Sequence, residues 1–324
     1  MAVHEVVPHR SVIPWESQVA TRAYQRFEAR GSVHGFDKED WEAASLELLG
    51  PNVPKTVMGR PQRVAELRSL KHLEGYAVAA LDGDVGTVVD FLIDDLSWTV
   101  RNLVVQTGTF FHGRQVLITP ISFREIDWSA RRFHVTLTAT KVKNSPILSA
   151  NSPVSRRLER SLYGYYGYPS YWMYPGLWGM ADDPQSMMDG AAVPVDTTSP
   201  TDHDDIHLRS VKEMSRCRIE GSDGFLGHIE DFIIDDLAWK TRYLVVNTSN
   251  WWVGKRVLIP PHWASSADLQ EGVVHLDLTR DAIRGSPIWD VGAPVNRDYE
   301  ERFYDYYGRP VYWAREKPTV SHDG

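Results

Sequence analysis

Two pairs of adjacent aspartates are the residues of this chain whose type and spacing could do chemistry. Paired carboxylates can bind a divalent cation or exchange protons with a substrate. In a turn between two strands, however, aspartates accept hydrogen bonds from backbone N–H groups, and an arginine further along the chain can form a salt bridge across the hairpin. We therefore interpret both sets as structural turn residues. They are Asp94, Asp95 and Arg101, and Asp235, Asp236 and Arg242.

Histidine and cysteine supply the other candidates for catalysis or metal binding. His134 and His275 occupy equivalent positions on the polar side of alternating segments, which favours exposed strand residues. The run from His203 to His207 could bind a divalent metal weakly, and Cys217 lies between two arginines that could lower its pKa. No hydrolase nucleophile motif, phosphate loop or dinucleotide fingerprint accompanies them. We expect no catalytic residue, no metal site and no cofactor, and hence a protein that is not an enzyme.

Tyrosine and tryptophan gather in two clusters together with glycine and proline. Such a cluster could close the open side of a small barrel as a plug, or it could form a docking surface. We favour the plug, with exposed tyrosine and tryptophan edges left for a protein interface. The candidate interaction residues are Tyr165, Tyr166, Tyr171, Trp172, Tyr306, Tyr307, Tyr312 and Trp313.

The aspartate pairs and the aromatic clusters occur twice because the chain contains an internal duplication. Residues 67–172 and 208–313 align without a gap at an offset of 141 positions. Both copies begin Leu-Arg-Ser, contain Asp-Phe-x-Ile-Asp-Asp-Leu-x-Trp and close with Tyr-Tyr-Gly-x-Pro-x-Tyr-Trp. The duplication predicts two domains of the same fold.

Alternation of apolar and polar residues predicts that each copy is built from short strands. In the first copy the expected strands cover 85–93, 103–105, 116–118 and 133–137, and the second copy repeats them. Helices are expected over 154–162 and 295–303, and Thr279 is expected to cap a one-turn helix. The fold class is therefore mainly β, with two tandem small antiparallel half-barrels, each followed by a short helix and an aromatic tail. Each copy is long enough to fold alone.

The remaining segments carry less pattern. Ser17 and Asp37 are placed to cap the two helices of an N-terminal hairpin. The segment between the copies is rich in aspartate and has little periodicity, which favours a flexible acidic linker. The expected organisation is an arm at 1–16, the helical hairpin at 17–50, a linker at 51–66, the first repeat at 67–173, the acidic linker at 174–207, the second repeat at 208–313 and a tail at 314–324.

The motifs of each copy resemble the PRC-barrel domain. Gly86-x-Val88-x-Asp90-x-x-Ile93-Asp94-Asp95 is followed by Arg101-x-Leu103-Val104-Val105 and Gly113-x-x-Val116-Leu117-Ile118-x-Pro120. The second copy matches as well and ends Leu278-Thr279-x-x-x-Ile283-x-x-x-Pro287. The resemblance implies a small β-barrel that docks proteins rather than making bonds. The family takes its name from the cytoplasmic domain of the photosynthetic reaction-centre H subunit, and it includes a domain of a ribosome-maturation factor.

A second resemblance covers residues 18–50. Ala23-Tyr24-x-x-Phe27-Glu28-x-x-Gly31, followed by Gly35-x-Asp37 and Trp41, is similar to a small bacterial domain family of unknown function. That family often stands at the N-terminus of other domains. The resemblance implies no activity.

Charge and hydropathy narrow the class of partner. The formal net charge is −8, and neither repeat has the clustered Lys and Arg of a nucleic-acid surface. The first repeat is slightly basic and the second slightly acidic, which could favour packing of the two on each other. No apolar run has the roughly 18 residues that cross a bilayer, and the start of the sequence lacks a signal-peptide pattern. We expect a cytoplasmic protein without membrane insertion.

These observations favour a non-catalytic protein-interaction or assembly adaptor of the bacterial cytoplasm. Its partner would be a protein of unknown identity, with no direct nucleic-acid contact. One alternative is a cytoplasmic-side component of a photosynthetic or electron-transfer membrane complex, docked peripherally as the H-subunit resemblance suggests. Another is a factor associated with ribosomes or RNA processing, which the charge distribution disfavours.

Overall fold

The structure of the protein is a computed structural model, and the chain in it divides into two compact units, Met1–Val64 and Ala65–Gly324. It describes residues 65–108, 113–146, 154–174, 176–189, 207–248, 255–268, 271–290 and 293–314, with five residues of the first unit. The expected arm at 1–16, most of the linker at 51–66, and residues 190–206 and 315–324 lie outside the described residues.

In the first unit, all five described residues are helical and fall within the expected hairpin at 17–50. Arg22 Nε donates to Glu47 Oε1 at 3.0 Å, and Arg26 Nη1 donates to Glu47 Oε2 at 3.3 Å. These contacts join residues from the two expected helices. Because the side chains are well exposed, the ion pairs add little stability.

The first repeat contains seven strands and a set of short helices. In chain order its elements are β1 (Leu67–Ser69), α3 (Leu70–Leu73), β2 (Ala77–Ala80), β3 (Gly83–Asp94), β4 (Thr99–Thr107), β5 (Gln115–Ile118), η1 (Pro120–Ser122), β6 (Phe123–Asp127), β7 (Arg132–Val135), α4 (Ala139–Lys143), α5 (Arg156–Tyr166), η2 (Tyr171–Met173) and α6 (Ser186–Asp189). The four expected strands correspond to β3, β4, β5 and β7. The sequence pattern missed β1, β2 and β6.

The second repeat has the same series of strands. Its elements are β8 (Leu208–Ser210), α7 (Val211–Met214), β9 (Arg218–Gly221), β10 (Gly224–Asp235), β11 (Thr241–Asn247), β12 (Arg256–Ile259), η3 (Pro261–Trp263), β13 (Ala264–Asp268), β14 (Val273–Leu276), α8 (Arg280–Arg284), α9 (Arg297–Tyr307) and η4 (Tyr312–Ala314). The Thr279 hydroxyl accepts from Ala282 N and caps α8, as expected. Gly308, in the left-handed conformation, ends α9.

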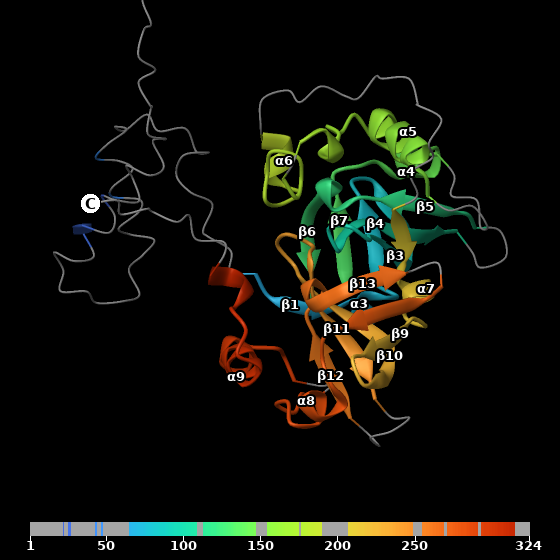
Figure 1. The fold of residues 1–324 in the computed structure, drawn as a ribbon. Coiled ribbons are helices and arrows are strands. Elements are labelled where there is room, and N and C mark those ends of the chain that lie inside the picture. The colour runs from blue at the N-terminus through green and yellow to red at the C-terminus, as the bar shows by residue number, and fades with distance from the viewer. Residues whose placement is uncertain are drawn as a thin grey trace, which may run out of the picture. The chain divides into compact units, whose positions relative to one another are not determined.

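Each repeat forms one open sheet that curves around an apolar core (Figure 1). The strand order is β5-β4-β3-β2-β7-β6 in the first and β12-β11-β10-β9-β14-β13 in the second. The expectation of purely antiparallel sheets is wrong, because β2 pairs with β7 in parallel and β9 pairs with β14 in parallel. Alternation of residue types indicates which face of the sheet a side chain occupies, but it does not indicate whether a neighbouring strand runs parallel or antiparallel. The parallel pairs could therefore not be predicted from the sequence.

The two sheets exchange their first strands. β1 of the first repeat pairs antiparallel with β10 of the second, and β8 of the second pairs antiparallel with β3 of the first. Figure 1 shows β1 lying among the strands of the second repeat. The expectation of two self-contained half-barrels therefore needs correction, because each seven-stranded sheet takes one strand from the other copy.

Two aspartates, Asp231 buried and Asp90 half-buried, hold the exchanged strands in place. Asp231 Oδ2 accepts from Ser69 Oγ at 2.5 Å, and its other oxygen accepts from Lys71 N at 3.0 Å. Asp90 makes the equivalent bonds to the second repeat, to Ser210 Oγ at 2.5 Å and to Lys212 N at 3.3 Å. Each carboxylate thus accepts from one N–H group in the first turn of the short helix that follows the exchanged strand. Burial raises the pKa of both aspartates, and these hydrogen bonds oppose the rise.

Candidate interaction site

The aspartate pairs lie at the turns that join the long strands. Asp94 Oδ1 accepts from Leu96 N at 3.0 Å and from Ser97 N at 3.1 Å. Its other oxygen accepts from Arg101, with Nη2 at 3.2 Å, and both side chains are buried. Burial opposes the charge of Asp94, but Arg101 and the turn N–H groups outweigh it and hold the pKa of this carboxyl below its usual value. The geometry is that of a turn cap.

The second pair repeats this arrangement. Asp235 Oδ1 accepts from Ala238 N at 2.5 Å, and Asp235 Oδ2 accepts from Arg242 Nε at 2.7 Å. The following aspartate of each pair bonds to the exchanged strand of the other copy or to the residue just before that strand. Asp95 Oδ2 accepts from Arg209 Nε at 2.9 Å, and Asp236 Oδ1 accepts from the backbone N–H of Glu66 at 2.9 Å. Both pairs therefore serve the turns and the exchanged strands.

The turns that follow the aspartates carry a tryptophan from each repeat into the other. Trp98 and Trp239 both have a positive φ, 55° and 58°, which is strained for a bulky residue and is held here by the hydrogen bond of each N–H to the first aspartate of the turn. Trp239 is fully buried against the first repeat, 5.1 Å from the ring of Phe123 and 6.1 Å from that of Phe133. Ala264 stands in the place of Phe123 in the second repeat, and Trp98 is only half-buried.

Part of the expected acidic linker packs on the first repeat. Trp178 is fully buried, and its indole N–H donates to Ala238 O at 2.8 Å. The Arg101 guanidinium lies 4.8 Å from the Trp178 ring and 3.8 Å from the Tyr171 ring, and Arg101 Nη1 donates to Leu177 O at 2.6 Å. We call these contacts the Trp178 site. The expectation of flexibility over 174–207 is wrong for this stretch, because one buried tryptophan with an acceptor for its N–H is enough to anchor a polar segment.

A buried polar network adjoins the Trp178 site. Glu159 is fully buried and accepts from Tyr171 Oη at 2.7 Å and from Arg156 Nη1 at 2.8 Å. His207 Nε2 lies 3.0 Å from Glu159 Oε2. Burial disfavours the charged imidazole, but the hydrogen bond and the charge of Glu159 outweigh it and raise the pKa of His207. The sequence pattern had placed His207 only in a weak metal cluster.

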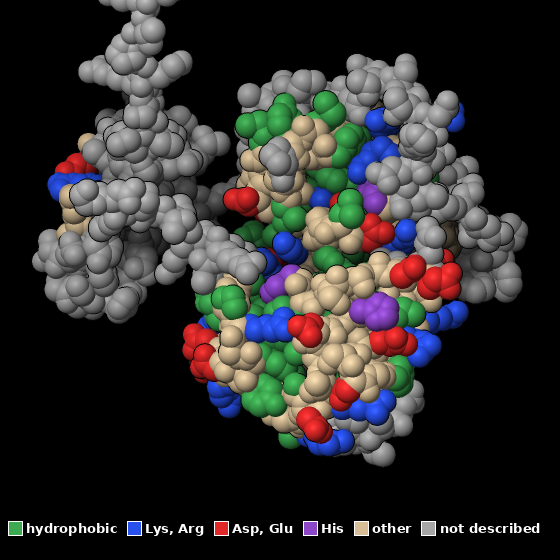
Figure 2. All heavy atoms as spheres, viewed as in Figure 1, with side chains coloured by type: hydrophobic (Ala, Val, Ile, Leu, Met, Phe, Trp, Pro, Cys, Tyr) green, Lys and Arg blue, Asp and Glu red, His purple; other side chains and the backbone are tan. Residues whose placement is uncertain are grey.

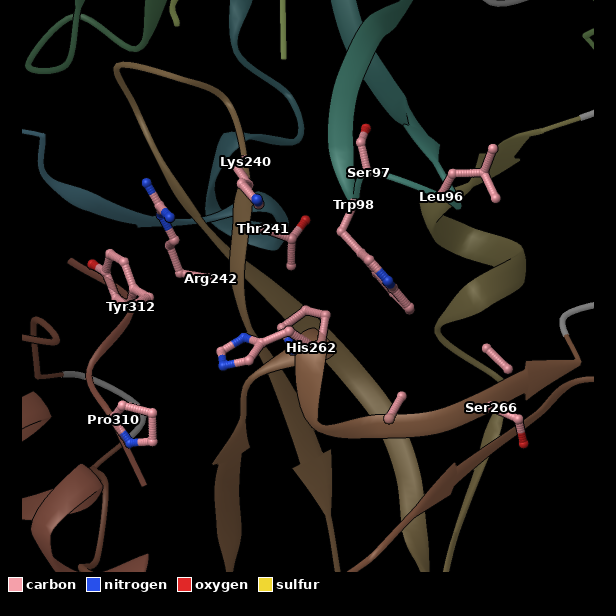
Figure 3. Close-up of a pocket in the computed structure, with 13 residues that line it drawn as sticks. Leu96, Ser97, Trp98, Lys240, Thr241, Arg242, His262, Ser266, Pro310 and Tyr312 are labelled. Atoms are coloured by element: carbon pink, nitrogen blue, oxygen red, sulfur yellow. The ribbon is translucent and has the colours of Figure 1, made fainter. Parts of the chain in front are cut away.

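The second repeat has a cavity at the equivalent position. It has a volume of about 530 Å³ and is lined by residues from both repeats, among them Trp98, Lys240, Arg242, His262, Ala264 and Tyr312. In Figure 3, Arg242 and Tyr312 lie on one side and Trp98 on the other, with His262 between them. The Arg242 guanidinium lies 4.2 Å from the Tyr312 ring, as Arg101 lies over Tyr171. We call this space the Trp98 cavity.

The aromatic candidates divide into packed and exposed residues. Tyr166 and Tyr171 are buried, Trp172, Tyr307, Tyr312 and Trp313 are half-buried, and Tyr165 and Tyr306 are exposed. Phe303 and Tyr304, which come just before Tyr306 in α9, are almost fully buried. The Phe303 ring stacks on the Trp263 ring with the centroids 5.3 Å apart. Most of each cluster therefore packs on its own repeat, and the Trp98 cavity places Tyr312 at the edge of an open site.

The remaining candidates do not come together. His134 is half-buried, the His275 side chain is 47% exposed, and burial raises the pKa of the Cys217 thiol, which keeps it protonated. Among the residues that the structure describes, no three His, Cys, Asp or Glu side chains form a group that could hold a metal ion. His203 lies outside that part of the chain.

The surface gives no sign of a nucleic-acid site on the face that Figure 2 shows. There, described Lys and Arg side chains intermix with Asp and Glu over the second repeat, whereas nucleic acid requires clustered basic residues. Within the described ranges, no helix has both the length and the apolar character that a membrane crossing requires.

Comparison with known families assigns the second repeat. Residues 210–283 match the model of the PRC-barrel domain, and residues 14–50 match a family described as protein of unknown function (DUF2934). The PRC-barrel match runs from the end of β8 into α8. No curated protein matches the chain. A PRC-barrel domain fits a non-catalytic adaptor or assembly role in general terms.

Proposed function

We propose that the protein is a non-catalytic adaptor of the bacterial cytoplasm, with two PRC-barrel-like repeats joined into one scaffold that docks partner proteins. The observation that carries the proposal is the pairing of a filled aromatic site with an open one. The first repeat closes its Trp178 site with a segment of its own chain, whereas none of the described residues fills the Trp98 cavity at the equivalent place in the second repeat.

The engagement of the acidic pairs also supports the proposal. Asp94 and Asp235 accept hydrogen bonds from turn N–H groups and from an arginine of the next strand, while Asp95 accepts from Arg209 and Asp236 from the N–H of Glu66. A general acid or base needs an atom that can reach a substrate, and a metal site needs several converging oxygens. These carboxylates serve the fold instead.

The test is to isolate the full-length protein with its partners from its own cells and to rebuild the complex from pure components. We expect at least one protein that co-purifies at a fixed stoichiometry and then binds the purified chain directly. A parallel incubation with the soluble metabolites of the same cells should give no turnover. Turnover that a substitution in the Trp98 cavity abolishes, or the absence of any stoichiometric partner, would contradict the adaptor function.

A further inference from the structure

The two repeats can be compared residue by residue at the aromatic sites. In the first repeat, the Trp178 indole is held by the Arg101 guanidinium, the Tyr171 ring and the Ala238 carbonyl, with ring centroids of Tyr171 and Trp178 6.2 Å apart. The same chain segment is fixed a second time further along, where Gln185 Nε2 donates to Pro120 O at 3.2 Å. A short segment with one inserted tryptophan thus covers this face of the first repeat.

The counterparts of these contact residues line the Trp98 cavity. At the offset of 141 positions, Arg101 corresponds to Arg242, Tyr171 to Tyr312 and Pro120 to Pro261; Ala238 corresponds to Ser97. The position that corresponds to Trp178 is Thr319, so the duplication does not supply the second repeat with a tryptophan there. The cavity therefore has the walls of a tryptophan site without a tryptophan at that position in the sequence.

The second repeat is also roomier and more basic at this place. Phe123, which packs on Trp239, is replaced by Ala264 beside Trp98. Thr99 is replaced by Lys240, which adds a positive charge to the wall, and Ile121 is replaced by His262, which adds a polar ring. Arg242 already pairs with Asp235 at 2.7 Å. The added charge favours an acidic occupant.

We propose that the Trp98 cavity binds a short segment of a partner protein that inserts a tryptophan and carries aspartate or glutamate within a few residues after it. The segment that covers the first repeat has this composition, because Asp182 and Asp183 follow Trp178. A buried tryptophan is a common anchor of protein interfaces, and the basic rim selects the acidic neighbours. This inference rests on the adaptor function and specifies the chemistry of the partner.

The probe is a fluorescein-labelled synthetic peptide with the sequence of residues 176–188, titrated with the full-length protein and followed by fluorescence anisotropy. We expect saturable binding that weakens at least tenfold, or about 1.4 kcal/mol, when the peptide tryptophan is replaced by alanine. Replacing both peptide aspartates by asparagine should weaken binding and flatten its dependence on salt.

The matched protein variants are A264F and S265F. Ala264→Phe restores the residue type of the first repeat and fills the cavity, so it should weaken peptide binding at least tenfold. Ser265→Phe adds the same ring on the same strand, at an exposed residue that does not line the cavity, and should leave binding unchanged. Circular dichroism and melting temperature confirm that both variants fold.

Three outcomes would overturn the inference. The first is that the peptide does not bind at all. The second is that A264F binds the peptide as well as the natural protein does, which would mean that the peptide displaces the covering segment of the first repeat, and the third is that A264F and S265F lose peptide affinity equally. A partner that binds A264F as well as it binds the natural protein would leave the adaptor function standing and remove the cavity from it. If no partner protein is found but the peptide binds tightly, the Trp98 cavity remains a tryptophan-binding site and the adaptor function is contradicted.

Discussion

Trp98 and Trp239 occupy equivalent positions and meet different surroundings. Trp239 is fully buried between aromatic rings of the first repeat, whereas Trp98 borders a cavity beside Ala264. We expect Trp239→Ala to lower the free energy of unfolding by about 3–5 kcal/mol. Trp98→Ala should cost at least about 1 kcal/mol less, because less packing is lost. Urea denaturation of the two variants measures the difference, and equal losses would contradict the asymmetry.

Ser69 Oγ donates to Asp231 Oδ2 at 2.5 Å, which is one of the hydrogen bonds that join the two repeats. Either replacement by alanine leaves a partner unsatisfied and should lower the free energy of unfolding by about 1–3 kcal/mol. The effects of substitutions at contacting residues on stability are not additive, so the double variant should lose less free energy of unfolding than the sum of the two single variants. A double-mutant cycle in denaturant measures this coupling. Additive losses would show that the two residues act separately.

His207 should make stability depend on pH. Its pKa is raised in the folded protein, so the bonded imidazolium stabilises the fold fully below the ordinary histidine value of about 6.5. That contribution disappears as pH rises through the raised folded pKa. His207→Gln should therefore destabilise the protein more at pH 5.5 than at pH 9. Urea denaturation of both proteins at the two pH values tests this. A loss of free energy of unfolding that is equal or larger at pH 9 would contradict a raised pKa of His207.

At the scale of elements, the helix α9 carries the aromatic tail of the second repeat. Phe303 is 1% exposed and stacks on Trp263, whereas Tyr306 is 44% exposed and donates one hydrogen bond to Ala282 O at 2.9 Å. Phe303→Ala should cost about 3–5 kcal/mol of stability, and Tyr306→Ala about 1 kcal/mol. Thermal melting of both variants compares them. A small loss for Phe303 would mean that the tail is not a packed part of the repeat.

The sequence predicted the long strands well, and it missed several of the short ones. β3 and β10 are long, apolar-rich strands of twelve residues each, and the aspartate turns and the Thr279 cap have specific residue types, so these features could be predicted. β1 and β8 have three residues each, too few for a period to appear. Trp178 lies in an acidic segment whose overall composition predicted flexibility, so the burial of this one tryptophan was not predicted.

The exchange of β1 and β8 could not be predicted for a further reason. The strands that accept them, β3 and β10, end in the same Asp-Phe-x-Ile-Asp-Asp motif. Local residue chemistry therefore fits pairing within a copy as well as pairing between copies. Contacts between distant parts of the chain favour pairing between the copies. Examples are the packing of Trp239 on Phe123 and the hydrogen bond from Arg209 to Asp95. The Trp98 cavity depends on the same arrangement, because its walls come from both copies.

At the scale of the whole second unit, the exchange makes the repeats interdependent. Each sheet loses one of its seven strands when the copies separate, and Trp239 loses its aromatic contacts. The unit should therefore unfold in one cooperative transition rather than as two domains.

The most direct test is to insert a protease site near residue 190, cleave the folded full-length protein and ask whether the two pieces remain together. The exchange predicts that they co-elute at a ratio of 1:1 in size-exclusion chromatography with an unchanged circular dichroism spectrum. Separation should then require denaturant, and each isolated piece should lose β structure. Two pieces that elute apart as stable folded monomers would contradict the exchanged fold and the scaffold built on it.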